Sequence, residues 1–179
     1  MSNPTYVFGA ADAKLRPLTS DQGSAPVYGT AIDVPGLKSI SISGSSSTKE
    51  LRGDHRTLAK VSVLESVEVT LEFAKWDPEI YAIVTGAVNT PGTDGSYEVV
   101  LSSNSQPGYF SVEAVSYAAE GAGSNVHIRL PKLIVTDLPD MVGLAEEDFK
   151  TVSIKCEALP LFSTGEHVVW GYNADAVAL

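Results

Sequence analysis

Residues 48–79, TKELRGDHRTLAKVSVLESVEVTLEFAKWDPE, decide the predicted fold. Charges surround a Gly-Asp corner, strict alternation of apolar and polar residues follows, and the stretch ends at the start of a helix. The alternating residues are Val67, Val69, Leu71 and Phe73 on one side and Glu68, Thr70 and Glu72 on the other. A period of two residues is typical of an antiparallel strand that buries one face and leaves the other face polar.

Alternation of the same kind recurs along the chain. The further segments are 37–43, 57–65, 96–102, 109–118, 125–135, 151–159 and 166–172. Clusters rich in Gly, Pro, Ser and Asn separate them, as turns separate short strands. The sequence therefore predicts a mainly β protein, a β-sandwich or barrel of antiparallel strands that forms a single domain over residues 1–179.

One short helix is predicted over residues 77–85, flanking the strands. Asp77 suits the N-cap, because a carboxylate there accepts hydrogen bonds from the first-turn N–H groups, and Pro78 suits the first helical position. Gly86 follows the last apolar residues, where a left-handed glycine commonly ends a helix. We expect this helix to cover one opening of the sheet layers.

Residues from about 43 to 57 are predicted to form a long exposed loop, and both termini are expected to be flexible. The Gly-Ser half of the loop has no apolar anchor, whereas its charged half contains a Gly53-Asp54 corner that suits a small hairpin. Arg52-Gly53-Asp54 also matches an integrin-binding tripeptide. Turn chemistry is the favoured interpretation, because three residues match by chance and no export signal is visible in MSNPTYVFGAADAK.

The composition narrows the function classes. Hydrophobic residues make up 44 % of the chain and charged residues 19 %, which is typical of a globular protein. A formal charge of −10 argues against tight binding of phosphate backbones. Residues 1–60 carry seven Lys and Arg against five acids, and residues 61–179 carry five against seventeen. Such an asymmetry suits head-to-tail assembly, although a chance split of surface charge is the alternative.

The motifs of catalysis and of cofactor or metal binding are not found in this sequence. His55, His127 and His167 lie in separate segments without a second ligand at metal-binding spacing, and the single cysteine, Cys156, lies in an alternating run. The acidic residues between 137 and 148 lack the order of a calcium loop. We therefore expect no catalytic residues, no metal and no cofactor, and hence a protein that is not an enzyme.

The order of these features resembles that of the major tail proteins, or tail tube proteins, of long-tailed, siphovirus-type bacteriophages. The resemblance rests on LKSISIS, the block ELRGDHRTLAKVSVLESVEVTLEF, the helix closing in VTG and the late strand GLAEEDFKTVSIKCEALP. It covers roughly residues 35–86 and 125–160 as a pattern of elements. Its most specific parts are the Gly53-Asp54 corner before paired strands, the helix end at Gly86 and the acidic turn before residue 151.

The resemblance implies a virion structural protein that self-assembles into stacked, hexameric rings and so forms a tube for genomic DNA. The lumen-facing residues it implies are Glu68, Thr70 and Glu72. The residues it implies for contact between rings are Lys49, Glu50, Arg52, Gly53, Asp54, His55, Arg56, Asp137, Asp140, Glu146, Glu147 and Asp148. Expected partners are other copies of the chain, tape-measure, tail-tip and tail-terminator proteins, and double-stranded DNA in transient passage, but no membrane. The expected location is the virion tail, assembled in the host bacterial cytoplasm.

Two other classes remain open from the sequence. One is the tube protein of a type VI secretion system or of a contractile injection particle, which would also form rings. The other is a monomeric β-sandwich that serves as a decoration or binding module.

Overall fold

The structure is a computed structural model that describes residues 12–34, 36–53, 56–75, 77–116, 125–139 and 151–173. Within these ranges the chain forms eleven strands and one helix. They are β1 (Asp12–Ser20), β2 (Val27–Tyr28), β3 (Ile32–Asp33), β4 (Leu37–Gly53), β5 (Arg56–Phe73), α1 (Pro78–Thr85), β6 (Val88–Pro91), β7 (Tyr97–Val100), β8 (Phe110–Ser116), β9 (Asn125–Asp137), β10 (Val152–Ala158) and β11 (Val169–Asn173).

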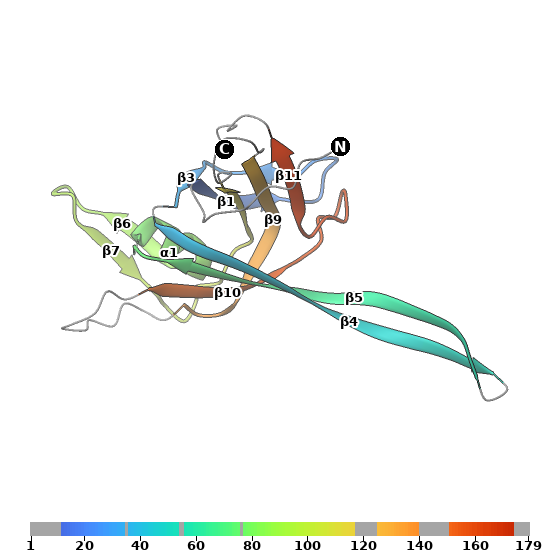
Figure 1. Cartoon of the computed structure of the whole chain (residues 1–179). Helices are drawn as coiled ribbons and strands as arrows, with labels where there is room; N and C mark the ends of the chain where they lie inside the picture. The colour runs from blue at the N-terminus through green and yellow to red at the C-terminus, as the bar shows by residue number, and fades with distance from the viewer. Residues whose placement is uncertain are drawn as a thin grey trace.

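Nine of the described strands form one sheet, and its pairings are antiparallel. The order is β2-β1-β8-β9-β10-β5-β4, with β11 added to β9 and β3 added to β1. The sheet curls into a half-barrel, while β6 and β7 form a separate hairpin beside α1 (Figure 1). The predicted fold class, a mainly β sandwich or barrel with one short helix, is confirmed.

The core fills the inside of the curled sheet. It contains the apolar side of each long strand, and its fully buried side chains include Leu15, Leu71, Phe110, Leu130 and Leu133. These residues come from β1, β5, β8 and β9, so the curl of the sheet brings distant parts of the chain into one cluster. Removal of this apolar surface from water is the main term that stabilises the body of the protein.

The helix begins and ends at the predicted residues. The Asp77 carboxylate accepts hydrogen bonds from the backbone N–H groups of Glu79 at 2.8 Å and Ile80 at 3.4 Å. Gly86 ends the helix with φ of 71°, a left-handed conformation. A side chain at this position would collide with the Gln106 backbone, so glycine is required for two reasons.

The predicted loop at 43–57 is wrong, since most of it lies in two long paired strands. β4 continues to Gly53 and β5 starts at Arg56, and they pair along almost their whole length. The serines that suggested flexibility lie in the ladder, where the hydroxyls of Ser45 and Ser66 are 2.7 Å apart. Backbone pairing compensates here for the lack of apolar anchors, and the predicted small hairpin is only the end of a much longer one.

Other boundaries also differ from those predicted. The expected strand at 57–65 and the alternating strand after it are one strand, β5. β1 was missed, because only Ala13 and Leu15 are deeply buried in it and Pro17 interrupts the alternation. The two termini, residues 1–11 and 174–179, lie outside the described residues.

Candidate assembly surfaces

A polar face covers four neighbouring strands of the sheet, on the side opposite the core. This polar sheet face consists of Ser39, Ser41 and Ser43 of β4, Glu68, Thr70 and Glu72 of β5, Ser153, Lys155 and Glu157 of β10, and Thr136 and Asp137 of β9. The opposite side of β5 is buried in the core, as its alternation predicts. The predicted lumen residues therefore do share one face. The role assigned to that face stays a prediction.

The register aligns these side chains into rows across three strands. Glu68 lies between Ser43 of β4 and Glu157 of β10, and Thr70 lies between Ser41 and Lys155. Directly opposed side chains of an antiparallel pair are close neighbours, and like charges in that position destabilise the pair. The Glu68–Glu157 pair therefore works against the stability of the subunit, which points to selection for another property of this face.

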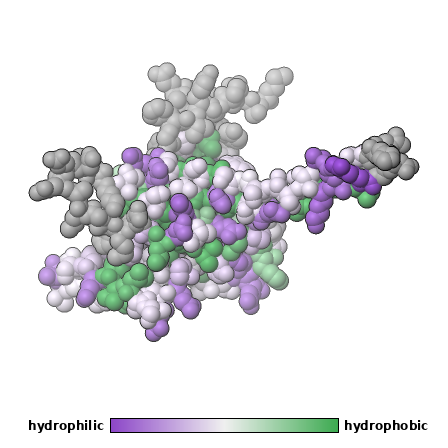
Figure 2. Space-filling model, turned by 90° about the horizontal axis from the view of Figure 1, so that it is seen from below, coloured by the Kyte–Doolittle hydropathy of each residue, from purple (hydrophilic) through white to green (hydrophobic). Residues whose placement is uncertain are grey.

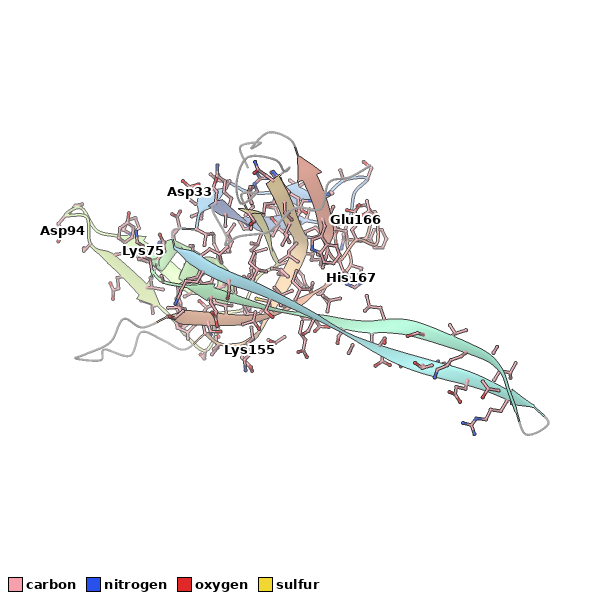
Figure 3. The ribbon with its side chains drawn as sticks, in the orientation of Figure 1. Asp33, Lys75, Asp94, Lys155, Glu166 and His167 are labelled. Carbon is pink, nitrogen blue, oxygen red and sulfur yellow. The ribbon has the colours of Figure 1, made fainter. Side chains whose placement is uncertain are left out.

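The charges of this face are mostly negative. Its acids are Asp137, Glu68, Glu72 and Glu157, and Lys155 is its one cation. The ammonium group of Lys155 lies 3.6 Å from the Asp137 carboxylate, and both side chains are exposed. Lys155 points away from the body of the molecule (Figure 3). A shallow hollow of about 360 Å³ lies beside this pair, bordered by Glu68, Thr70 and Glu157.

The outer parts of β4 and β5 form a second surface. We define the outer ribbon as residues 44–53 of β4 and 56–66 of β5. β10 pairs with β5 only between Glu68 and Phe73, so the outer ribbon is a two-stranded hairpin that projects from the body (Figure 1). In Figure 2 it stands clear of the body, with hydrophilic and hydrophobic side chains both visible along it. Two-stranded hairpins with unpaired edges are marginally stable and readily bind other chains.

Part of the predicted contact set is already paired inside the ribbon. Glu50 accepts from the Arg52 guanidinium at 3.0 Å, and its other carboxylate oxygen lies 3.2 Å from the Lys60 ammonium group. These three residues lie on one side of the ribbon, because Glu50 and Lys60 are directly opposed. Arg52 and Lys60 are well exposed, so each pair contributes little to the stability of the free chain.

Asp137, predicted for contact between rings, lies instead on the polar sheet face with the predicted lumen residues, because it is opposed to Lys155. The remaining predicted contact residues divide into two groups. Lys49 lies on the side of the ribbon opposite Glu50, Gly53 is the last residue of β4, and Arg56, described only in its backbone, is the first of β5. The second group lies outside the described residues: Asp54, His55, Asp140, Glu146, Glu147 and Asp148. The structure therefore does not test whether the ribbon meets this acidic stretch in a neighbouring copy.

Sequence reasoning missed a buried ion pair that holds three segments together. The Lys132 ammonium group lies 2.7 Å from the Asp21 carboxylate, which also accepts the Phe162 N–H at 3.1 Å. Lys132 further sits over the ring of Tyr109, 4.8 Å from its centroid. The hydrogen bond from Lys132 lowers the pKa of Asp21, in spite of desolvation. Residues 111 positions apart carry no pairing signal in the sequence, so only the fold identifies them.

The described residues offer little for covalent or metal chemistry. Burial raises the pKa of the Cys156 thiol to about 12, so it is a poor nucleophile at neutral pH. Nδ1 of His167 lies 3.0 Å from the Ala158 carbonyl oxygen, a structural contact. Within the described ranges, no group of three or more His, Cys, Asp or Glu side chains is arranged to hold a metal ion. The same ranges contain no helix with the length and apolar character needed to cross a membrane.

Comparison with known proteins adds no relative: no protein-family profile matches this chain, nor does any curated protein sequence. The functional argument therefore rests on the two surfaces and on the pattern of the sequence.

Proposed function

We propose that this protein is a tail tube subunit of a long-tailed bacteriophage. Copies of the chain assemble into rings, with hexamers as the expected form, and the rings stack into a hollow tube through which the genomic DNA passes. The tube is built in the host bacterial cytoplasm and becomes part of the virion, where tape-measure, tail-tip and tail-terminator proteins are its expected neighbours.

The polar sheet face is the observation that carries the proposal. A bore for DNA needs a broad polar surface that does not bind phosphate, because each phosphate contact made by a cation slows passage and depends on salt. This face has four acids against one lysine, and that lysine is near Asp137. The opposed Glu68 and Glu157 are costly for an isolated subunit and useful in a bore that repels DNA.

The dimensions of such a tube follow from strand geometry. The polar sheet face spans four neighbouring strands, in the order β9-β10-β5-β4. If six copies each contribute these strands, about 24 strands spaced ~4.8 Å apart and tilted by ~40° form a barrel about 48 Å across the backbone. Side chains reduce the bore to roughly 40 Å, which is wide enough for a DNA duplex and water.

The outer ribbon supplies the reach that stacking requires. It is part of the same two strands that would line the bore, and it extends beyond the region where β10 supports them. A ribbon in this position can touch a copy in the next ring while the inner half of each strand stays in its own subunit. The outer ribbon has exposed strand edges, and an isolated two-stranded hairpin is only marginally stable. Both properties are typical of a segment that binds another chain.

Electron microscopy of the purified protein tests the proposal most directly. Rings or tubes with a central channel are the expected result in negative stain, over a range of protein concentrations. A chain that stays monomeric at high concentration would contradict the proposal and favour the decoration or binding module. Tubes that assemble only with a sheath protein would favour the contractile or type VI class.

The role of the polar sheet face is tested by reversing its charge. Glu68→Lys combined with Glu72→Lys is expected to preserve assembly and to make the tubes retain duplex DNA at low salt, with release as salt is raised. In a phage that carries these substitutions, DNA ejection is expected to slow or stop.

The matched control is Glu79→Lys combined with Asp12→Lys, which makes the same change of charge at exposed positions away from this face. The control tubes are expected not to retain DNA. Equal retention by both pairs would mean that total charge, and not this face, governs DNA contact. A tube structure with Glu68 and Glu72 on the outer wall would also contradict the assignment.

A further inference from the structure

The outer ribbon has an apolar side that the body does not cover. The register places Ser47, Lys49 and Leu51 of β4 on the same side as Ala59, Val61 and Val63 of β5, and we call this side the apolar ribbon face. The side chains of Leu51, Val61 and Val63 are 62 %, 58 % and 50 % exposed. The ion-paired residues Glu50 and Lys60 occupy the other side, where Leu64, nearer the body, is the exposed apolar residue.

The β6–β7 hairpin has a second face of the same kind. Val88 is opposed to Val100, and Thr90 is opposed to Glu98. We call these four residues the hairpin face. Val88 is 62 % exposed and Val100 is 45 % exposed, whereas Asn89 and Val99 on the other side of the hairpin are half-buried. Val88 and Val100 therefore form an exposed apolar pair on this side, while Tyr97, on the other side of the hairpin, is also exposed.

The two faces lie at opposite ends of the molecule. The outer ribbon projects at one end, and the β6–β7 hairpin, with Asp94 in its connecting turn, lies at the other (Figures 1 and 3). One chain therefore cannot bring its own two faces together. Two different surfaces at opposite ends of one chain form a heterologous contact, which continues from copy to copy instead of closing as a two-fold dimer.

The charges of the two faces are complementary. Each carries a single charged residue, Lys49 among the apolar residues of the ribbon and Glu98 among those of the hairpin. Two twisted two-stranded hairpins can pack face to face, as the sheets of a sandwich do, and an ion pair between Lys49 and Glu98 would then favour one orientation. A second copy of this chain therefore offers an apolar pair and a charge of opposite sign to each face.

We propose that the apolar ribbon face of one copy binds the hairpin face of the next copy, with Lys49 beside Glu98. This contact rests on the proposed function, since both need copies of the chain to bind one another, and it names the surfaces that do so. In this contact, burial of Leu51, Val61 and Val63 supplies most of the binding free energy, and the charges of Lys49 and Glu98 set the orientation.

Capping variants test this pairing of surfaces. Val61→Asp blocks only the apolar ribbon face and Val100→Asp only the hairpin face, so each purified variant is expected to stop at one finite size, a single chain or a single ring. The equimolar mixture is expected to double that mass and then stop, because one intact ribbon face meets one intact hairpin face. Sedimentation velocity or mass photometry measures all three samples.

Control variants separate this result from misfolding. Val27→Asp introduces the same charge at a valine of β2 that is 55 % exposed and belongs to neither face, and it is expected to assemble like the wild type. If Val100→Asp lowers the Tm of the unassembled chain, Val88→Asp replaces it on the same face. Growth of either capping variant, or no doubling of mass in the mixture, would overturn the proposed contact.

The charged pair gives an independent test of orientation. Lys49→Glu or Glu98→Lys alone is expected to raise the concentration needed for assembly by about two- to fivefold, the range of an exposed ion pair, and the two together are expected to restore it. Disulfide formation between a Lys49→Cys chain and a Glu98→Cys chain, mixed as separate proteins, tests proximity directly. The native Cys156 is only 2 % exposed and is not expected to compete.

The outcomes distinguish this contact from the proposed function. If the wild type never assembles, the tail tube proposal fails together with the contact. If the wild type forms tubes and the capping variants also form tubes, only the contact fails.

Discussion

The inner and outer halves of β5 continue one alternation in the sequence, but a β-bulge at Glu65 puts their valines on opposite sides of the β4–β5 ladder. In the inner half, Val67, Val69 and Leu71 are at most 5 % exposed. In the outer half, Val61 and Val63 are at least 50 % exposed. The bulge accounts for the difference: the inner valines face the core, whereas Val61 and Val63 lie on the side that continues the polar sheet face, in a half that pairs with β4 alone.

This difference shows that one strand can serve two purposes. Burial of apolar side chains stabilises the inner half within the body, and it contributes much more than the exposed ion pairs of the ribbon. The outer half depends on backbone pairing until another chain covers it. We therefore expect substitutions in the body to affect the folding of the free subunit, and substitutions in the outer ribbon to affect its assembly.

The largest expected loss of stability comes from the core. Phe110→Ala removes a fully buried ring and should lower the free energy of unfolding by about 3–5 kcal/mol. Val63→Ala in the ribbon, as the control, should change it by no more than about 0.5 kcal/mol in the unassembled chain. Urea titration of both variants measures the contrast, and equal losses would mean that the ribbon is part of the cooperative core.

The next largest effect is expected at the buried ion pair of the body. Asp21→Asn leaves Lys132 without its carboxylate in a site where the two side chains are 9 % and 17 % exposed. Because this pair is only partly buried, loss of the carboxylate should cost about 1–3 kcal/mol, the range for a group left without its hydrogen-bond partner. The exposed pair of Lys14 and Asp33 is the control, and Asp33→Asn should cost about 0–1 kcal/mol.

The same ion pair gives a pH dependence with a defined sign. The pKa of Asp21 is lowered from 3.8 in the folded chain, so its stabilisation is complete above that ordinary value and is lost as pH falls through the lower folded value. Below about pH 4, the difference in unfolding free energy between the wild type and Asp21→Asn should therefore become smaller. A constant difference in unfolding free energy down to pH 2 would contradict this assignment.

A smaller effect is expected at the helix N-cap. Asp77→Ala removes the acceptor for the N–H groups of Glu79 and Ile80 and should cost about 1 kcal/mol. Asp77→Ser keeps a capping oxygen and should restore most of the stability. A Tm of the alanine variant equal to that of the wild type would show that the cap is not needed.

The smallest effect is expected for the charges of the ribbon. Glu50→Gln weakens the contacts with Arg52 and Lys60 and should change the stability of the unassembled chain by less than about 1 kcal/mol. The difference should shrink further at about 1 M salt, where exposed charges are screened. A double-mutant cycle with Lys60→Gln measures the coupling, and a value above about 1 kcal/mol would mean that the ribbon is held by its charges.

Local patterns account for the parts of the fold that were predicted. The alternation of β5 depends on two-residue periodicity, and α1 depends on Asp77 and Gly86 at its ends, so both can be read from neighbouring residues. Two predictions failed because local signals were misleading: β1 was not predicted, and residues 43–57 were predicted to be a loop. Pro17 and the serine run carry local signals for turns, while the pairings that hold them as strands come from β8 and β5.

The polar sheet face was predicted in part. Glu68, Thr70 and Glu72 followed from alternation in one strand, but their neighbours on β4 and β10 did not, since strand order is not encoded locally. The alternation of TVSIKCEAL contains the signal for Ser153, Lys155 and Glu157 as a polar set. It does not indicate which strand lies beside it.

By itself, the sequence determined which residues share a face over each run of a strand between bulges, where the helix begins and ends, and the antiparallel, mainly β class, because these depend on periods of a few residues. Only the tertiary structure decided which of those faces are covered. It joins Asp21 to Lys132 across 111 positions, opposes Glu68 to Glu157, and leaves the apolar side of the outer ribbon exposed. The physical reason is that burial depends on strands that are distant in sequence, and that a single bulge in β5 moves its alternating valines from the core side to an uncovered side.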